Sequence, residues 1–224
     1  MEEDRFSDIV KDATRVLQEG GLVVYPTDTS YGLACDPRLP DALERLIQAK
    51  KRDKKHGVPL LFADFDQCKT FHDFLGLESV LARLFWPGGM TLLVTAKRDV
   101  PDEITGGRDS VAIRVPDHEI PRSIARELGA PIVGTSANVH HAPTPFDIDT
   151  AKQQLGDSVE LYIDGGPSSA TKSSTIISVI MEQDRGHIKV YREGQLSLEE
   201  LESSLKVDSD AIRLWTTTFL QADM

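Results

Sequence analysis

Apolar side chains recur at helical spacing near the start of the chain, and a short apolar run follows them. In residues 7–19 one helical face carries Ile9, Val10, Ala13, Val16 and Leu17. The glycine pair at 20–21 ends this predicted helix. The next four residues, Leu-Val-Val-Tyr at 22–25, predict a short buried strand. Helix and strand patterns therefore alternate from the first residues onward.

The same alternation continues along the chain. Helical spacing recurs at 41–50, in two pieces between 64 and 86, at 120–128 and at 149–155. Runs of strand length lie at 59–63, 91–95, 110–115, 131–134, 160–164, 175–180 and 188–191. Because the last two strands follow each other almost directly, we predict an α/β fold with a mixed sheet rather than a parallel one.

The strand predicted at 110–115 places an arginine among apolar neighbours. On strict alternation Val111, Ile113 and Val115 share one face, and Ala112 and Arg114 share the other. A buried Arg114 would need an anionic partner. On the solvated face of an antiparallel strand it would be an ordinary surface arginine. The pattern leaves both interpretations open.

Polar residues follow two of the predicted strands, and cations follow one helix. Residues 27–30, Thr-Asp-Thr-Ser, come directly after the first strand, and Ser136 and Asn138 follow the strand at 131–134. Lys50 and Arg52 lie at the end of the helix at 41–50. Cations, hydroxyls and an amide at strand ends are suited to binding a polyanion. Taken singly, these segments are also typical of a solvated helix end and of ordinary turns.

Composition and charge narrow the class of protein. The 224 residues are 40% hydrophobic and 27% charged, as in soluble globular proteins. No run approaches the roughly 18 apolar residues of a membrane span, and the acidic start is unlike a signal peptide, so we expect a cytoplasmic protein with no membrane contact. The net charge of −11 argues against tight independent binding of nucleic acid, but not against a small anion in a basic pocket.

Other candidate motifs are discounted. Residues 166–173 approach a phosphate-binding loop, but Thr171 stands where its second glycine belongs and a strand pattern follows instead of a helix. Ser173 and Ser174 could still face a ligand. The six histidines and the two cysteines show no metal-ligand spacing, so we expect no protein metal site.

Seven segments, taken together and in order, resemble one family. They are 26–33, Lys50-x-Arg52, 85–91, 111–116, 136–138, 174–176 and 192–194. This order is similar to that of the YrdC family of threonylcarbamoyl-AMP synthases and covers residues 20–194. The resemblance implies a twisted mixed open sheet with helices packed on it around a large, positively charged cavity. It also implies the short form of the enzyme, with one catalytic domain at 1–206. The remaining tail, 207–224, is expected to pack on the body or on a partner subunit, because it carries Ile212, Leu214, Trp215, Phe219 and Leu220.

The resemblance further implies a reaction and its participants. L-threonine, bicarbonate or carbon dioxide, and ATP would give threonylcarbamoyl-AMP and pyrophosphate, with Mg²⁺ bound to the ATP phosphates. The product would pass to a tRNA threonylcarbamoyl transferase, with weak or indirect tRNA contact by this chain. We expect a monomer or a homodimer.

The resemblance assigns roles to individual residues. It implies Lys50 and Arg52 as catalytic, phosphate-binding residues, which we expect to be solvent-accessible in the cavity. The expected ATP-binding residues are Lys50, Arg52, Ser136, Asn138, Thr144 and Arg192. The expected L-threonine-binding residues are Thr27, Arg114 and Ser174.

One segment departs from the family pattern. The loop at 53–59 is longer than the one common after Lys-x-Arg, and it resembles that of the YciO-like branch. A YciO-like ATP- or RNA-binding protein without synthase activity is therefore an alternative. Two further alternatives remain. One is a protein that binds tRNA or double-stranded RNA, and the other is an ATP-dependent carbamoyl or acyl transferase like the YrdC-like domain of hydrogenase maturation proteins.

Overall fold

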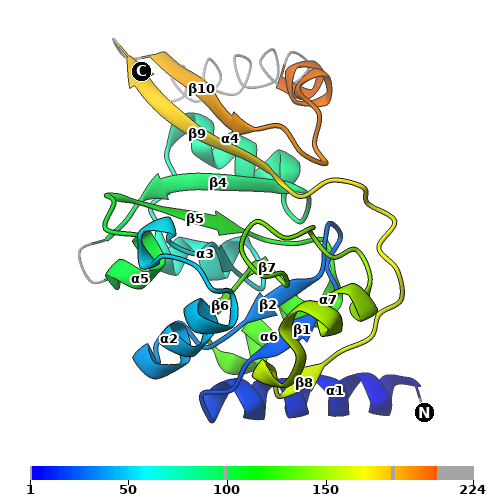
Figure 1. Cartoon of the computed structure of the whole chain (residues 1–224). Helices are drawn as coiled ribbons and strands as arrows, with labels where there is room; N and C mark the ends of the chain where they lie inside the picture. The colour runs from blue at the N-terminus through cyan, green and yellow to red at the C-terminus, as the bar shows by residue number, and fades with distance from the viewer. Residues whose placement is uncertain (1, 98–99, 183–184, 206–224) are drawn as a thin grey trace.

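The computed structural model describes residues 2–97, 100–182 and 185–205 (Figure 1). Its helices include α1 (Glu2–Gln18), α2 (Pro40–Ala49), α3 (Phe65–Phe71), α4 (Gly76–Phe85), α5 (Asp102–Thr105), α6 (Glu119–Leu128) and α7 (Ile148–Leu155), with the 3₁₀ turns η1 (Lys54–His56) and η2 (Gly156–Ser158). Residues 198–205 are helical as well. No helix of these residues is long and apolar enough to cross a membrane. The predicted tail at 207–224 lies outside the described residues.

The described strands form two sheets. Their bounds are β1 (Val23–Tyr25), β2 (Gly32–Ala34), β3 (Leu60–Leu61), β4 (Met90–Thr95), β5 (Ser110–Arg114), β6 (Ile132–Val133), β7 (Thr135–Ser136), β8 (Leu161–Tyr162), β9 (Thr175–Glu182) and β10 (Arg185–Arg192). The smaller sheet has the order β7-β2-β1-β8, and the larger has β10-β9-β4-β5-β3-β6.

Both sheets are mixed, so the predicted fold class is confirmed. In the larger sheet β4 pairs parallel to β9 and antiparallel to β5, while in the smaller one β1 pairs parallel to β8 and antiparallel to β2. The sequence predicted most of these strands but treated β2 and β7 as loops. Both are very short and contain glycine, serine or threonine, residues that are equally common in turns.

The chain passes from one sheet to the other at Gly134, which separates β6 from β7. Gly134 N donates to Pro59 O at 2.8 Å, and a Cβ at this position would lie 2.2 Å from Leu61 Cγ. Only glycine allows the backbone to approach β3 this closely. This passage brings the polar segment after β7 alongside both sheets.

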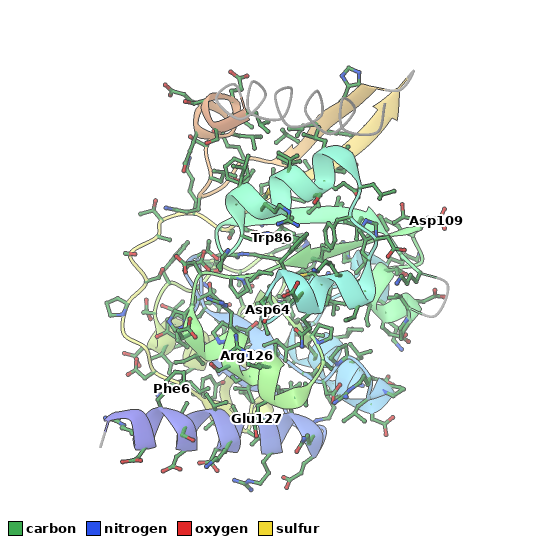
Figure 2. The ribbon with its side chains drawn as sticks, turned by 180° about the vertical axis from the view of Figure 1, so that it is seen from behind. Phe6, Asp64, Trp86, Asp109, Arg126 and Glu127 are labelled. Atoms are coloured by element: carbon green, nitrogen blue, oxygen red, sulfur yellow. The ribbon has the colours of Figure 1, made fainter. Side chains whose placement is uncertain are left out.

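Helices cover one side of the two sheets, as the view from behind shows (Figure 2). There α1, α6, α3 and α4 follow one another along the molecule, and Asp64 before α3 lies 3.9 Å from Arg126 of α6. The buried faces of α1 and α6 pack together over β1, with Ala13, Leu17 and Ile124 fully buried. With this side covered, the polar strand ends lie elsewhere, around the cavity described next.

The close approach at Gly134 predicts a stability effect. Gly134→Ala should lower the free energy of unfolding by about 1–3 kcal/mol, because its methyl group overlaps the Leu61 side chain. Urea unfolding measures this. In a Leu61→Ala background the same substitution should cost clearly less, since the two positions are in contact. Equal costs in both backgrounds would contradict the packing described.

Candidate active site

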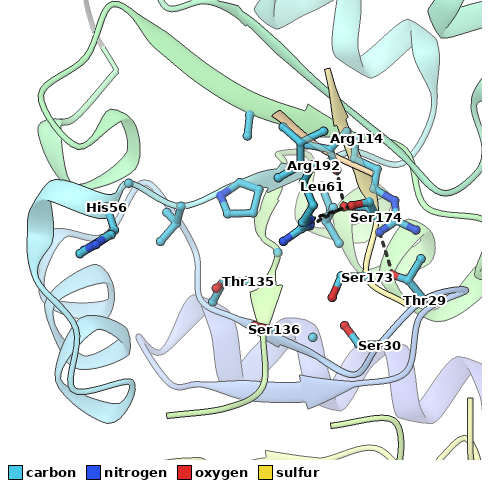
Figure 3. Close-up of a pocket in the computed structure, with 18 of the residues that line it drawn as sticks. Thr29, Ser30, His56, Leu61, Arg114, Thr135, Ser136, Ser173, Ser174 and Arg192 are labelled. Atoms are coloured by element: carbon cyan, nitrogen blue, oxygen red, sulfur yellow. Dashed lines mark hydrogen bonds between the residues drawn. The ribbon is translucent and has the colours of Figure 1, made fainter. Parts of the chain in front are cut away.

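Strands of both sheets and the segment after α2 enclose a cavity of about 410 Å³, within the range of small-molecule pockets. Figure 3 shows His56 on one side of it and Arg114 with Thr29 on the other. Among the described residues, Arg52, Arg108, Arg114 and Arg192 line this cavity, and no carboxylate does. The positive charge of the cavity as a whole stays a prediction.

Arg114 occupies one end of the cavity and is 5% exposed. Its Nη2 donates to Asp28 Oδ1 at 2.6 Å, its Nη1 to Thr29 Oγ1 at 2.9 Å and its Nε to Gly88 O at 2.8 Å. The alternation predicted for this strand is confirmed, because Val111 and Ile113 are in the core and Ala112 lines the cavity with Arg114. Of the two interpretations left open by the sequence, the buried, ion-paired arginine is the right one.

The polar loop after β1 is a connected network beside Arg114. Thr27 Oγ1 donates to Ser30 O at 2.6 Å, and it accepts from Thr29 N at 3.0 Å. Thr27, Thr29 and Ser30 all line the cavity. The loop therefore holds its hydroxyl groups at fixed positions rather than serving as a solvated turn.

Ser174 and Arg192 complete this end of the cavity. Ser174 Oγ lies 2.8 Å from Thr91 Oγ1, and Arg192 Nη2 donates to Ser174 Oγ at 3.3 Å. Partial burial, and then the positive charge of Arg114, lower the pKa of Arg192. The structure thus brings together the three residues predicted for threonine, with Arg192 beside them (Figure 3).

Lys50 does not lie where the sequence predicted. It is 2% exposed and is not among the residues that line the cavity, so the expectation of a solvent-accessible side chain is wrong. Its Nζ donates to Ser136 O at 2.5 Å, Asn138 O at 2.7 Å and Asn138 Oδ1 at 3.3 Å. Three oxygen acceptors match the three donors of an ammonium group, which allows it to be buried. Lys50 thus holds the segment after β7 in place.

The other residues predicted for the nucleotide divide into two groups. Arg52, Ser136 and Arg192 line the cavity, Arg192 at the end that holds Arg114, whereas Asn138 and Thr144 are not among its lining residues. Asn138 instead accepts from Ser136 Oγ at 2.6 Å and donates to Ala142 O at 2.7 Å. Asn138 is therefore placed to orient Ser136.

Arg108 and His56 also line the cavity, and the sequence pattern did not single out either. Arg108 follows two glycines in the turn between α5 and β5, which is typical of a solvated surface turn. His56 was treated as one of several scattered histidines. Their positions follow from contacts between distant segments, for which the sequence carried no signal.

Comparison with known proteins identifies the family. A family model described as "Telomere recombination", that of the Sua5, YciO and YrdC proteins, matches residues 15–194. The chain belongs to this Sua5/YciO/YrdC family, which confirms the resemblance noted from the sequence.

Individual relatives are similar over most of the chain. The threonylcarbamoyl-AMP synthase of Idiomarina loihiensis is 35% identical over 168 residues, covering 73% of this chain and 89% of that protein. The structure of Pyrococcus abyssi Sua5 complexed with L-threonine is 33% identical with a TM-score of 0.80, covering 87% of this chain and 56% of that one. The structure of Escherichia coli YciO is 26% identical with a TM-score of 0.73, covering 84% of this chain and 89% of that one.

Buried Lys50 predicts a pH dependence of stability. Burial, and then the charge of Arg52, lower the pKa of Lys50 to about 7. The unfolded chain therefore keeps this proton up to a higher pH than the folded protein does. The free energy of unfolding should rise between pH 7 and the ordinary lysine pKa of about 10.4.

Lys50→Met tests this prediction, because methionine removes the charge and remains unbranched. Urea unfolding at pH 7.0 and 9.5 should show a rise in the wild-type protein that exceeds the rise in the variant by more than about 1 kcal/mol. Lys69→Met, at a lysine that is exposed on α3, is the control and should behave like the wild type. Equal pH dependence in all three proteins would contradict the burial of Lys50.

Proposed function

We propose that this chain is a threonylcarbamoyl-AMP synthase, which converts L-threonine, bicarbonate or carbon dioxide, and ATP into threonylcarbamoyl-AMP and pyrophosphate. The observation that carries the proposal is the position of Arg114 in a cavity shared with hydroxyl groups, in a chain whose relatives bear that enzyme name. L-threonine is the ligand of the P. abyssi Sua5 complex, which supports the same substrate for this chain.

Arg114 has the donors that a threonine carboxylate requires. A guanidinium group carries five N–H donors, of which the described residues take up three. One N–H on each Nη nitrogen is left for a bidentate contact with a carboxylate. Thr27 and Ser174, which line the same cavity, offer hydroxyl groups for the polar remainder of the amino acid.

The nucleotide would extend from this end toward Arg52. Ser136 lies on that path, held through Asn138 by Lys50. Mg²⁺ would enter with ATP and take its ligands from phosphate oxygens and water, since no carboxylate of the described residues lines the cavity. Bound there, it would neutralise phosphate charge.

The proposed reaction depends mainly on positioning of the substrates and on stabilisation of the negative charge that develops. The threonine nitrogen first bonds to the carbon of bicarbonate, which loses water, or to that of carbon dioxide, in which case the nitrogen loses a proton, and either route gives a carbamate. A carbamate oxygen then attacks the α-phosphorus of ATP, and the bond to the β-phosphate oxygen breaks to release pyrophosphate. Negative charge grows on the leaving group, so guanidinium groups and fixed hydrogen-bond donors stabilise the transition state. The arginine and hydroxyl side chains that line this cavity are groups of those types.

The product would serve tRNA modification through a separate transferase, because threonylcarbamoyl-AMP is an activated acyl donor. The net charge of −11 favours delivery to such a partner over direct tRNA binding by this chain. We expect the protein to work as a monomer or a homodimer in the cytoplasm.

Pyrophosphate release from ATP by the purified protein tests the proposed function. The assay is run in bicarbonate buffer with and without L-threonine, and again without bicarbonate. Release that requires both is the expected result. ATP binding without threonine-dependent release would contradict the proposal and favour the YciO-like alternative.

Substitution of Arg114 should affect L-threonine selectively. Arg114→Ala should raise the KM for L-threonine at least about tenfold, because a charge-assisted contact to the carboxylate is lost. Binding of ATP alone, measured by calorimetry, should change much less. Arg126→Ala removes an exposed arginine of α6 and should leave both values unchanged. An unchanged KM for L-threonine in Arg114→Ala would contradict the assigned role.

A further inference from the structure

Two arginines bind the backbone of the loop at 53–58, at the end of the cavity away from Arg114. Arg52 directly precedes this loop, and Arg108 comes from a distant segment of the chain. Arg52 Nη2 donates to Gly57 O at 2.5 Å. Arg108 Nη1 donates to Lys55 O at 3.2 Å, and its Nη2 donates to His56 O at 3.0 Å. Three consecutive carbonyl groups of the loop are thus bound by two guanidinium groups, both of which line the cavity.

Glycines make this arrangement possible. Gly57 and Gly106 adopt left-handed conformations, with φ of 57° and 66°. A Cβ at Gly106 would lie 2.4 Å from Lys55 O, and one at Gly57 would lie 2.8 Å from Arg108 Nη2. The turn after α5 therefore packs directly on the loop, and two hydrogen bonds to loop carbonyl groups hold the exposed Arg108 side chain against it.

The charges at this end differ from those at the other. The Arg114 end holds two arginines, Arg114 and Arg192, and one carboxylate, that of Asp28, which pairs with Arg114. No carboxylate of the described residues lies within ion-pair distance of Arg52 or Arg108. Burial, and then the positive charge of Arg108, lower the pKa of Arg52. The two guanidinium groups thus repel each other, and a bound anion would relieve that repulsion.

Both guanidinium groups keep donors for such an anion. The described residues take up two of the five N–H groups of Arg108, and at most two of those of Arg52, which also lies 3.4 Å from Thr135 Oγ1. A fork of N–H donors matches the oxygens of a phosphate group in geometry and charge. His56, which lines the same end, adds a further polar group beside them.

We propose that Arg108 and Arg52 together form a diphosphate subsite, which binds the β- and γ-phosphates of the nucleotide and holds them when they leave as pyrophosphate. The inference rests on the proposed function for its substrate and adds Arg108, outside the Lys-x-Arg and Ser-x-Asn segments, to the residues that contact it. It also gives the 53–58 loop a role, because the arginines that hold its carbonyl groups are those that would bind the phosphates.

Binding measurements with three ligands test the subsite. Calorimetry at constant Mg²⁺ compares ATP, AMP and inorganic pyrophosphate on the wild-type protein, Arg108→Ala, Arg108→Lys and the surface control Arg126→Ala. Arg108→Ala should weaken ATP and pyrophosphate binding by about tenfold or more, as expected for lost bonds between charged groups. AMP binding should change by less than about twofold, because AMP lacks the β- and γ-phosphates. Arg126→Ala should match the wild type throughout.

Arg108→Lys keeps the positive charge but not the planar fork, so its loss of ATP affinity should lie between those of the wild type and the alanine variant. If Arg108→Ala does not fold, the lysine variant decides the question. Unchanged pyrophosphate binding in a folded Arg108 variant would overturn the proposal. So would an equal loss of AMP and ATP affinity, which would mean that Arg108 supports only the loop.

The same assay separates this inference from the proposed function, since it contains neither threonine nor bicarbonate. Pyrophosphate binding that depends on Arg108, in a protein without threonine-dependent turnover, would support the subsite and refute only the synthase reaction. A wild-type protein that binds neither ATP nor pyrophosphate would overturn the subsite itself.

Discussion

The buried ammonium group of Lys50 joins the end of α2 to the segment that enters the smaller sheet. That segment comes directly after the passage at Gly134, and its backbone carbonyl groups accept from Lys50 Nζ. Without the Lys50 amino group, which donates N–H bonds in its charged and its neutral form, the oxygens of Ser136 and Asn138 would be brought together with no donor between them. The geometry of one side of the cavity depends on this contact, because Ser136 lines the cavity and Asn138 orients its hydroxyl group.

The cavity that results is chemically asymmetric. At one end the Asp28 carboxylate offsets one of two positive charges, those of Arg114 and Arg192, and it keeps the remaining donors of Arg114 in a set orientation. At the other end Arg52 and Arg108 bind only neutral oxygens of the described residues. A ligand with a carboxylate at one end and a more highly charged phosphate group at the other would bind in a single orientation. Orientation is what an adenylation of a carbamate requires most.

Much of the fold could be predicted from the sequence, because periodicity determined most helices and strands and the strand alternation placed Arg114 on the polar face. The partner of that arginine could not be predicted, since Asp28 lies 86 residues away and only the sheet arrangement brings them together. The run of cations at 50–52 did not reveal that Lys50 is buried while Arg52 lines the cavity. Arg108 was missed because a Gly-Gly-Arg turn looks the same whether it faces solvent or packs on a distant loop.

A crystal structure of the protein with L-threonine and a non-hydrolysable ATP analogue tests the central claim most directly, because it shows the orientation of both substrates at once. We predict the threonine carboxylate on Arg114 and the β- and γ-phosphates between Arg52 and Arg108, with Lys50 still bound to Ser136 and Asn138. Phosphates on Arg114, or a triphosphate that reaches neither Arg52 nor Arg108, would contradict the division of the cavity into an amino acid end and a diphosphate end.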